Sequence, residues 1–202
     1  AWSRYSFIGV NCEATLTAEN GLATWLGKPP AGAPSGIDPL VALRLSANHL
    51  KSPKIAGLPP LTGGLVGYLG YDSVRRLEKL PNSAIDDLQI PELAFMLTTD
   101  LAVLDHSDGT ITLIANAINW DGSDERVDDA YHAAVARLDQ MEKDLAVPLP
   151  GFLSQLSKPA TGAIASNISA PEFLAKIAAI KEEILAGEAF QVVLSQRFEI
   201  EC

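Results

Sequence analysis

Short runs of apolar residues separated by turn-forming residues occur in two parts of the chain. They occupy Ser6–Val10, Ala14–Ala18, Leu22–Leu26, Leu93–Leu97, Leu101–Leu104 and Thr110–Ala115. Runs of this length bounded by turn residues predict strands. Asn20-Gly21 separates the second run from the third, and Ser107-Asp108-Gly109 lies between the last two, as turn residues do in hairpins. The pattern therefore predicts antiparallel sheet.

Three other segments repeat their apolar residues at helical spacing. The first starts at Asp38 and Pro39, a typical N-cap and first helical residue; the second follows Ser123. The third begins with a capping box of Ser169 and Glu172 and ends at Gly187. Their apolar faces contain Leu40, Leu43, Ala47 and Leu50; Val127, Ala130, Tyr131, Ala134, Leu138, Met141 and Leu145; and Phe173, Ile177, Ile180 and Ile184. We expect these faces to be buried against the rest of the fold.

Residues 63–72, Gly-Gly-Leu-Val-Gly-Tyr-Leu-Gly-Tyr-Asp, mix glycines with large apolar side chains. Glycine lets another backbone come close, so the stretch predicts a buried strand with tight crossings, followed by a short helix from Tyr71. No Gly-Lys-Ser/Thr follows, and the spacing never gives Gly-x-Gly-x-x-Gly. A packing role is therefore favoured over a ligand cradle.

The segment Val147–Ser166 contains three prolines and two glycines with few periodic apolar residues. This composition is typical of a linker. We therefore divide the chain into an amino-terminal portion, 1–150, a linker, 151–168, and the first helix and strand of a second portion, 169–202.

Charge and composition exclude several classes of protein. The formal net charge is −10, and no cluster of Lys and Arg is present to replace the counterions of a nucleic acid. No run approaches the roughly 20 apolar residues that span a bilayer, and no signal-peptide pattern opens the chain. We expect a cytoplasmic protein that binds neither nucleic acid nor membrane. Cys12 and Cys202 lack metal-ligand spacing and are expected to be plain thiols.

Three candidate groups for chemistry each have a structural alternative. Asp86-Asp87 suits a metal or a shared proton, but solvated surface carboxylates are the favoured interpretation. His106, at a predicted turn, is favoured as a hydrogen-bonded loop residue over a general base. Gln191 lies in the β-prone run Phe190–Phe198, where a buried amide needs hydrogen-bond partners. It either has a structural role, as a buried amide hydrogen-bonded to its neighbours, or faces a polar cavity; the structural role is favoured.

Three strings together resemble the anthranilate synthase component I family. They are residues 2–9, Trp-Ser-Arg-Tyr-Ser-Phe-Ile-Gly; residues 63–72; and residues 184–198, Ile-Leu-Ala-Gly-Glu-Ala-Phe-Gln-Val-Val-Leu-Ser-Gln-Arg-Phe. They occur in the family's order and spacing, and residues 111–127 resemble actinobacterial members. The chain opens without Met and ends directly after a predicted strand. We therefore expect an amino-terminal fragment.

The resemblance implies an α+β fold of large, mostly antiparallel sheets with flanking helices, an α/β sandwich that is incomplete in this fragment. It also implies a lyase that converts chorismate and ammonia to anthranilate and pyruvate with Mg²⁺. A glutamine amidotransferase subunit supplies the ammonia within a heterotetramer, and tryptophan inhibits the enzyme at a separate site. The family's Mg²⁺ ligands and catalytic residues are expected beyond Cys202. The resemblance thus predicts no metal site in this fragment, which should be inactive alone.

The resemblance also implies roles for four residues. Gln191 occupies the position of a lysine general base in relatives that add water to chorismate; an amide cannot take that proton at neutral pH, which fits ammonia as nucleophile. Arg4, Tyr5 and Ser6 match part of the family's tryptophan pocket, although a surface arginine is an equally good interpretation of Arg4. Two alternatives remain: aminodeoxychorismate synthase component I, and a noncatalytic regulatory module that binds an amino acid.

Overall fold

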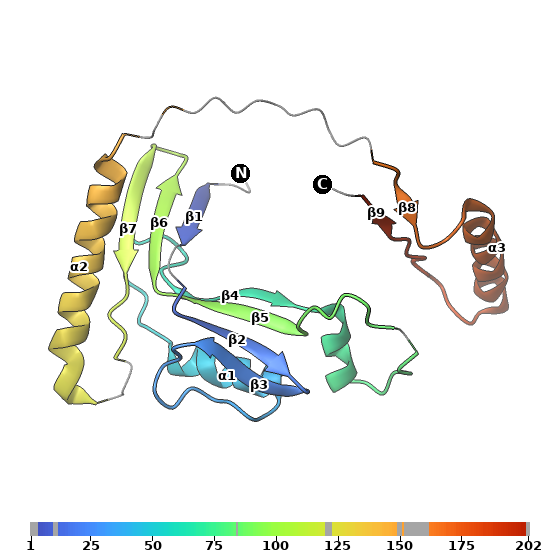
Figure 1. Ribbon diagram of the computed structural model, residues 1–202, viewed down its shortest axis with the longest axis horizontal. Coiled ribbons are helices and arrows are strands. Elements are labelled where there is room, and N and C mark those ends of the chain that lie inside the picture. The colour runs from blue at the N-terminus through green and yellow to red at the C-terminus, as the bar shows by residue number, and fades with distance from the viewer. Residues whose placement is uncertain are drawn as a thin grey trace. The chain divides into compact units, whose positions relative to one another are not determined.

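The computed structural model describes residues 4–9, 12–83, 85–119, 123–148, 151 and 162–200. The chain forms two compact units, Ala1–Leu149 and Pro150–Cys202 (Figure 1). Val10, Cys202 and most of the predicted linker lie outside the described residues. The functional division of the chain at 150 and 168 stays a prediction.

The first unit contains a four-stranded antiparallel sheet in the order β3-β2-β5-β4. The strands are β2 (Ala14–Glu19), β3 (Leu22–Gly27), β4 (Gly64–Leu69) and β5 (Leu93–Thr98). The β2–β3 hairpin turns at Asn20 and Gly21, with φ of 50° and 78°. These left-handed angles are those of a tight hairpin turn, as Asn-Gly predicted.

Helix α1 (Pro39–His49) packs on this sheet. The carboxylate of Asp38 accepts hydrogen bonds from the backbone N–H groups of Leu40 and Val41, at 2.9 and 3.0 Å, which confirms the predicted cap. The predicted apolar face is only partly correct. Its buried residues are Pro39, Ala42 and Ser46, whereas Ala47 is exposed. Small side chains let the helix lie close to Leu16, Ala23 and Leu93 of the core.

A second antiparallel sheet has the order β1-β6-β7. It consists of β1 (Tyr5–Gly9), β6 (Asp100–Asp105) and β7 (Thr110–Ala115). Helix α2 (Val127–Ala146), preceded by the short helix η2 (Asp124–Arg126), lies along β7 (Figure 1). Ala134 is the buried residue of its predicted stripe. Tyr131 and Leu145 are more than half exposed, so only part of that stripe is core.

Strand β4 confirms the packing role of the glycines. A Cβ on Gly67 would lie 1.8 Å from the carbonyl oxygen of Ala94, and one on Gly70 would lie 2.9 Å from that of Glu92. The expectation of a buried strand is wrong, because β4 is the outer strand of its sheet and its last four residues are exposed. The predicted short helix follows as η1 (Tyr71–Arg76).

The second unit contains α3 (Ala170–Ala186) and a two-stranded pair of β8 (Ala165–Ser166) and β9 (Phe198–Glu199). Ser169 caps α3 by accepting from the Glu172 N–H at 3.4 Å, and Gly187 ends it with φ 85°. The predicted strand over Phe190–Phe198 is wrong except for its last residue. Phe198 pairs with Ser166 of β8, and within the described residues no strand pairing extends from there into 190–197. A β-prone run becomes a strand only where a neighbouring strand shares a ladder of hydrogen bonds with it.

Both sheets of the first unit are antiparallel and carry helices on their sides. The predicted fold class, α+β with mostly antiparallel sheets and flanking helices, is therefore confirmed.

Candidate functional site

The start of β1 brings the three predicted effector residues together. Antiparallel pairing sets Tyr5 opposite Asp105 of β6. The Arg4 guanidinium donates from Nε to both Asp105 oxygens, at 3.0 and 3.1 Å, and from Nη2 to one of them at 2.7 Å. The central carbon of the Arg4 guanidinium, Cζ, lies 4.9 Å from the centre of the Tyr5 ring. Ser6 Oγ lies 2.8 Å from His106 Nε2, which confirms His106 as a hydrogen-bonded loop residue.

The Arg4–Asp105 pair determines the electrostatics of this edge. The hydrogen bonds from Arg4, with further ones from Ser107, hold the pKa of Asp105 well below its usual range against the opposing effect of desolvation. The same pair raises the pKa of Arg4. Arg4 thus already holds one carboxylate. An incoming carboxylate would have to replace Asp105 or use the remaining guanidinium nitrogen.

An apolar cavity of about 360 Å³ adjoins the other end of β1. Phe7 and Gly9 line it, and they lie on the same face of the strand as Tyr5 because side chains alternate along a strand. Cys12 also lines it as an exposed free thiol whose Sγ donates to the Ala14 carbonyl at 3.0 Å. The remaining lining residues are Leu61, Val66, Met96, Leu97, Thr98 and Leu101.

Gln191 belongs to the second unit, in the segment between α3 and β9. Its side chain is exposed, so the interpretation as a buried structural amide is wrong. Its expected place in an active site stays a prediction.

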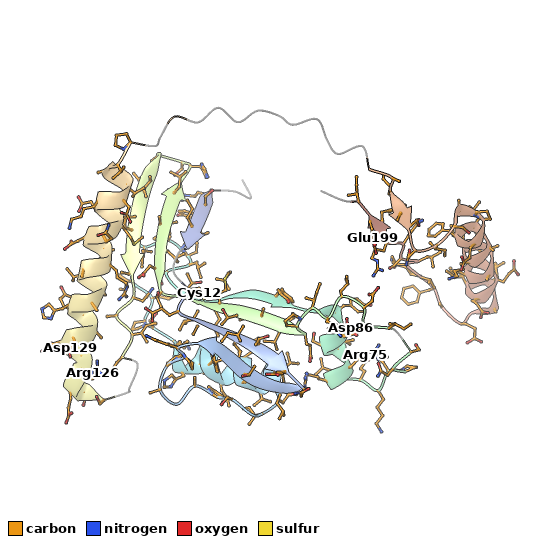
Figure 2. The ribbon with its side chains drawn as sticks, in the orientation of Figure 1. Cys12, Arg75, Asp86, Arg126, Asp129 and Glu199 are labelled. Atoms are coloured by element: carbon orange, nitrogen blue, oxygen red, sulfur yellow. The ribbon has the colours of Figure 1, made fainter. Side chains whose placement is uncertain are left out.

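The acidic pair of the η1–β5 loop serves local structure at Asp86, whose carboxylate accepts from the Gln89 N–H at 2.9 Å. Figure 2 shows Asp86 and Arg75 in this part of the first unit. Across the described part of the chain, no group of three or more His, Cys, Asp or Glu side chains is placed to hold a metal ion.

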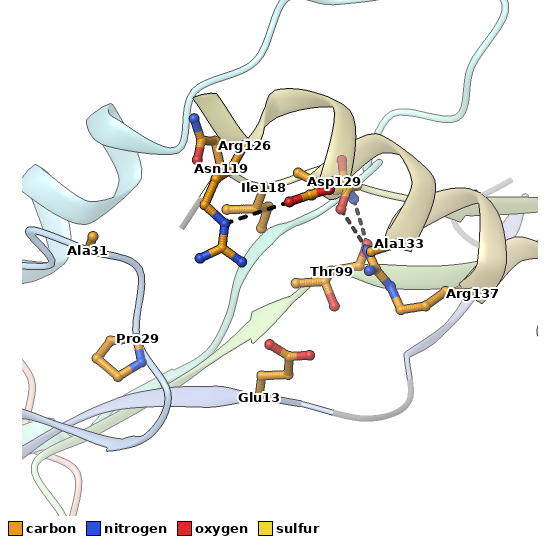
Figure 3. A pocket seen from close by; sticks show the side chains of 12 residues that line it. Glu13, Pro29, Ala31, Thr99, Ile118, Asn119, Arg126, Asp129, Ala133 and Arg137 are labelled. Atoms are coloured by element: carbon orange, nitrogen blue, oxygen red, sulfur yellow. Dashed lines mark hydrogen bonds and ion pairs between the residues drawn. The ribbon is translucent and has the colours of Figure 1, made fainter. Parts of the chain in front are cut away.

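A second cavity, of about 370 Å³, lies beside the start of α2 (Figure 3). Five segments line it: the chain before β2, the loop after β3, the β5–β6 junction, the chain after β7, and η2 with the first turns of α2. The lining residues are Glu13, Pro29, Ala31, Thr99, Asn116, Ile118, Asn119, Arg126, Asp129, Ala130, Ala133 and Arg137. No sequence pattern indicated this cavity, because its lining residues are up to 124 positions apart.

Comparison with known proteins identifies the family. Residues 1–202 match a protein family described as "chorismate binding enzyme". The chain belongs to this family. The resemblance carried by the three sequence strings is thereby confirmed.

Relatives named anthranilate synthase component 1 match the whole of this chain. The one from Mycolicibacterium smegmatis is 53% identical over 201 residues, and the one from Arthrobacter globiformis is 50% identical over 206 residues. The chain spans only 38% and 39% of their respective lengths.

A solved structure shows the fold. The crystal structure of anthranilate synthase component I from Streptococcus pneumoniae TIGR4 aligns with a TM-score of 0.76 and 24% identity, over 97% of this chain and 41% of that one. Each helix among the described residues is too short or too polar to span a bilayer.

Proposed function

We propose that the chain is the amino-terminal part of an anthranilate synthase component I. The complete enzyme would be a lyase that converts chorismate and ammonia to anthranilate and pyruvate. The observation that carries the proposal is the 50–53% identity, over this whole chain, with relatives of that name.

The test is an assay of the full-length protein with chorismate and ammonium, followed by anthranilate fluorescence. We expect anthranilate from the full-length protein and none from the 202-residue chain alone, because the chain corresponds to about two-fifths of the relatives. Formation of 4-amino-4-deoxychorismate would instead favour the folate-pathway enzyme. Absence of any product from the full-length protein would overturn the proposal.

The cofactor and partners belong to the same proposal. We propose Mg²⁺ bound by residues outside these 202, a glutamine amidotransferase subunit that supplies ammonia, and a cytoplasmic heterotetramer. Activity should then disappear with EDTA and return with Mg²⁺, and glutamine should replace ammonium only when the second subunit is present. Activity that survives EDTA unchanged would remove the metal from the proposal.

Gln191 is proposed to line the active site near the attacked carbon. A neutral amide leaves water unactivated, so ammonia remains the nucleophile. Gln191→Lys in the full-length protein should lower amination and yield some hydroxylated product, measured by chromatography. Unchanged amination without such a product would remove this role.

Tryptophan is proposed as an inhibitor that binds near Arg4, Tyr5 and Ser6. Support comes from the apolar cavity on the Tyr5 face of β1 and from the guanidinium at the start of that strand. Arg4→Ala in the full-length protein should weaken inhibition by tryptophan and leave uninhibited activity unchanged. Inhibition equal to that of the unaltered enzyme would exclude Arg4 from the effector site.

A further inference from the structure

The cavity beside α2 carries a balanced set of charges around small apolar side chains. Its charged lining groups are the carboxylates of Glu13 and Asp129 and the guanidinium groups of Arg126 and Arg137. In Figure 3, Glu13 and Arg126 point into the same space from two sides, one from the chain before β2 and the other from η2. Apolar surface comes from Pro29, Ala31, Ile118, Ala130 and Ala133.

Arg137 is held in a fixed orientation. Its Nε donates to the two oxygens of Asp100 at 2.9 and 3.0 Å, and its Nη2 donates to the Asn116 carbonyl at 2.8 Å. Asp100 is only 3% exposed, so the pair fixes the guanidinium plane. Nη1 makes no hydrogen bond to the described residues. A guanidinium positioned in this way loses little side-chain entropy when its remaining N–H groups bind an anionic group.

Glu13 supplies the opposite charge. Its backbone carbonyl accepts from the Lys28 N–H at 2.8 Å, which ties this residue to the end of the β2–β3 hairpin. Its carboxylate makes no hydrogen bond or ion pair within the described part of the chain. A carboxylate that faces a cavity in this way accepts N–H groups, and it binds a charged donor such as an ammonium more strongly than a neutral one.

The balance of charges selects the class of ligand. A simple anion would approach Glu13 and Asp129 as well as the arginines, which already face carboxylates: Arg126 lies 4.0 Å from Asp129. A simple cation would lie beside two guanidinium groups. A molecule with one positive and one negative charge can place its positive charge against a carboxylate and its negative charge against a guanidinium. These contacts offset the free energy that desolvation of the two charges costs.

We propose that this cavity binds a small zwitterion. Its ammonium lies at Glu13, its carboxylate lies at Arg137 and Arg126, and its apolar body contacts Ala130 and Ala133. The volume of about 370 Å³ falls within the range of roughly 300–1,000 Å³ typical of small-molecule sites. The cavity is separate from the Arg4 edge, and the proposal does not rest on the proposed function.

Calorimetry on the full chain with four probes tests the proposal. Norleucine and 6-aminohexanoate are isomers with both charges, adjacent in one and at opposite ends in the other; hexanoate and hexylamine carry one charge each. We expect at least one isomer to bind about tenfold more tightly than both single-charge probes, as a charge-assisted contact predicts. The better isomer reports how far apart the two charges are bound.

Two glutamate variants then locate the site. Glu13→Gln keeps the size of the side chain and should reduce binding of the preferred isomer to the level of hexanoate, without change in the melting temperature. Glu19→Gln, an exposed glutamate at the end of β2, is the matched control and should bind as the unaltered chain does. The amide signals of Ala130 and Ala133 should shift on titration. Equal binding of hexanoate and the isomers, binding unaffected by Glu13→Gln, or no binding of any probe would overturn the proposal.

Discussion

The strands β1 and β4 are both outer strands of their sheets. Different contacts hold them to their neighbours: close backbone packing holds β4, and side-chain bonds hold β1. Strand β4 pairs with β5 over six residues, and its glycines let backbone atoms of the two strands come into contact. Strand β1 pairs with β6 over five residues and is tied by side chains, through Arg4–Asp105 and Ser6–His106.

The difference has a physical consequence. Close backbone packing depends on the absence of a side chain and is indifferent to salt and pH. An exposed ion pair depends on both. The β4 edge should therefore respond to volume, whereas the β1 edge should respond to charge.

The largest effect is expected from Gly67→Ala. The new Cβ would lie 1.8 Å from the Ala94 carbonyl oxygen and 2.6 Å from the Phe95 Cα, and backbone cannot move aside without breaking the β4–β5 pairing. We expect a loss of about 3 kcal/mol in the free energy of unfolding, measured with urea, and faster deuterium exchange in β4. Gly162→Ala is the control, because nothing lies within 4 Å of a Cβ there. Equal stability of the two variants would contradict the packing role.

Arg76→Met should have the second largest effect. Arg76 follows β4 and joins three segments: it donates to Glu92 at 2.5 and 2.6 Å, to Asp38 at 2.8 Å and to the Gly21 carbonyl at 3.1 Å. Its side chain is 19% exposed, and its removal leaves two partly buried carboxylates unpaired. We expect a loss of about 2 kcal/mol by urea unfolding, below the cost for a fully buried pair.

The neighbouring arginine provides the control. Arg75, on the same short helix, pairs with the exposed Asp72 at 3.2 Å and donates to the Pro81 carbonyl at 2.8 Å. Arg75→Met should cost less than about 1 kcal/mol, as for other exposed pairs. If both arginine variants lost the same amount, the junction at Arg76 would have no special role.

Local features of this fold were predictable because their partners lie within a few residues. The Asn20-Gly21 turn, the Asp38 cap and the Gly187 helix end each depend on backbone groups next to them. The strand expected at 190–198 failed for the opposite reason. Its β-propensity is high, but a strand also needs a neighbour, which no local pattern specifies.

In the candidate sites, too, features set by neighbouring residues were predictable and features set by distant residues were not. The sequence strings were sufficient to identify the family. They could not indicate that Asp105 holds Arg4 across 101 positions, or that Asp100 fixes Arg137 across 37. Contacts of that kind arise from the pairing of strands and the packing of α2, so the cavity beside α2 becomes visible only in the folded chain.

Arg4→Ala should have a smaller effect than either change near β4. The Arg4 side chain is 54% exposed, so water and salt screen its bond to Asp105. We expect a small fall in the melting temperature at low ionic strength that disappears in about 1 M sodium chloride, where the Debye length is only about 3 Å. Gly67→Ala should stay equally destabilised in both buffers. A fall for Arg4→Ala that persisted at high salt would show that Arg4 acts through packing.

The smallest effect is expected from Asp105→Asn, and it should depend on pH. Arg4 and Ser107 lower the pKa of the folded Asp105 carboxyl, so the ionised form is favoured by folding. Stability from this group is complete above the unfolded pKa, about 3.9, and is lost as the pH falls towards the folded pKa. The stability difference between the unaltered chain and Asp105→Asn should thus be constant from about pH 7 to pH 5 and shrink below about pH 4. A difference that grew on acidification would contradict the assignment, because it would require a raised pKa at Asp105.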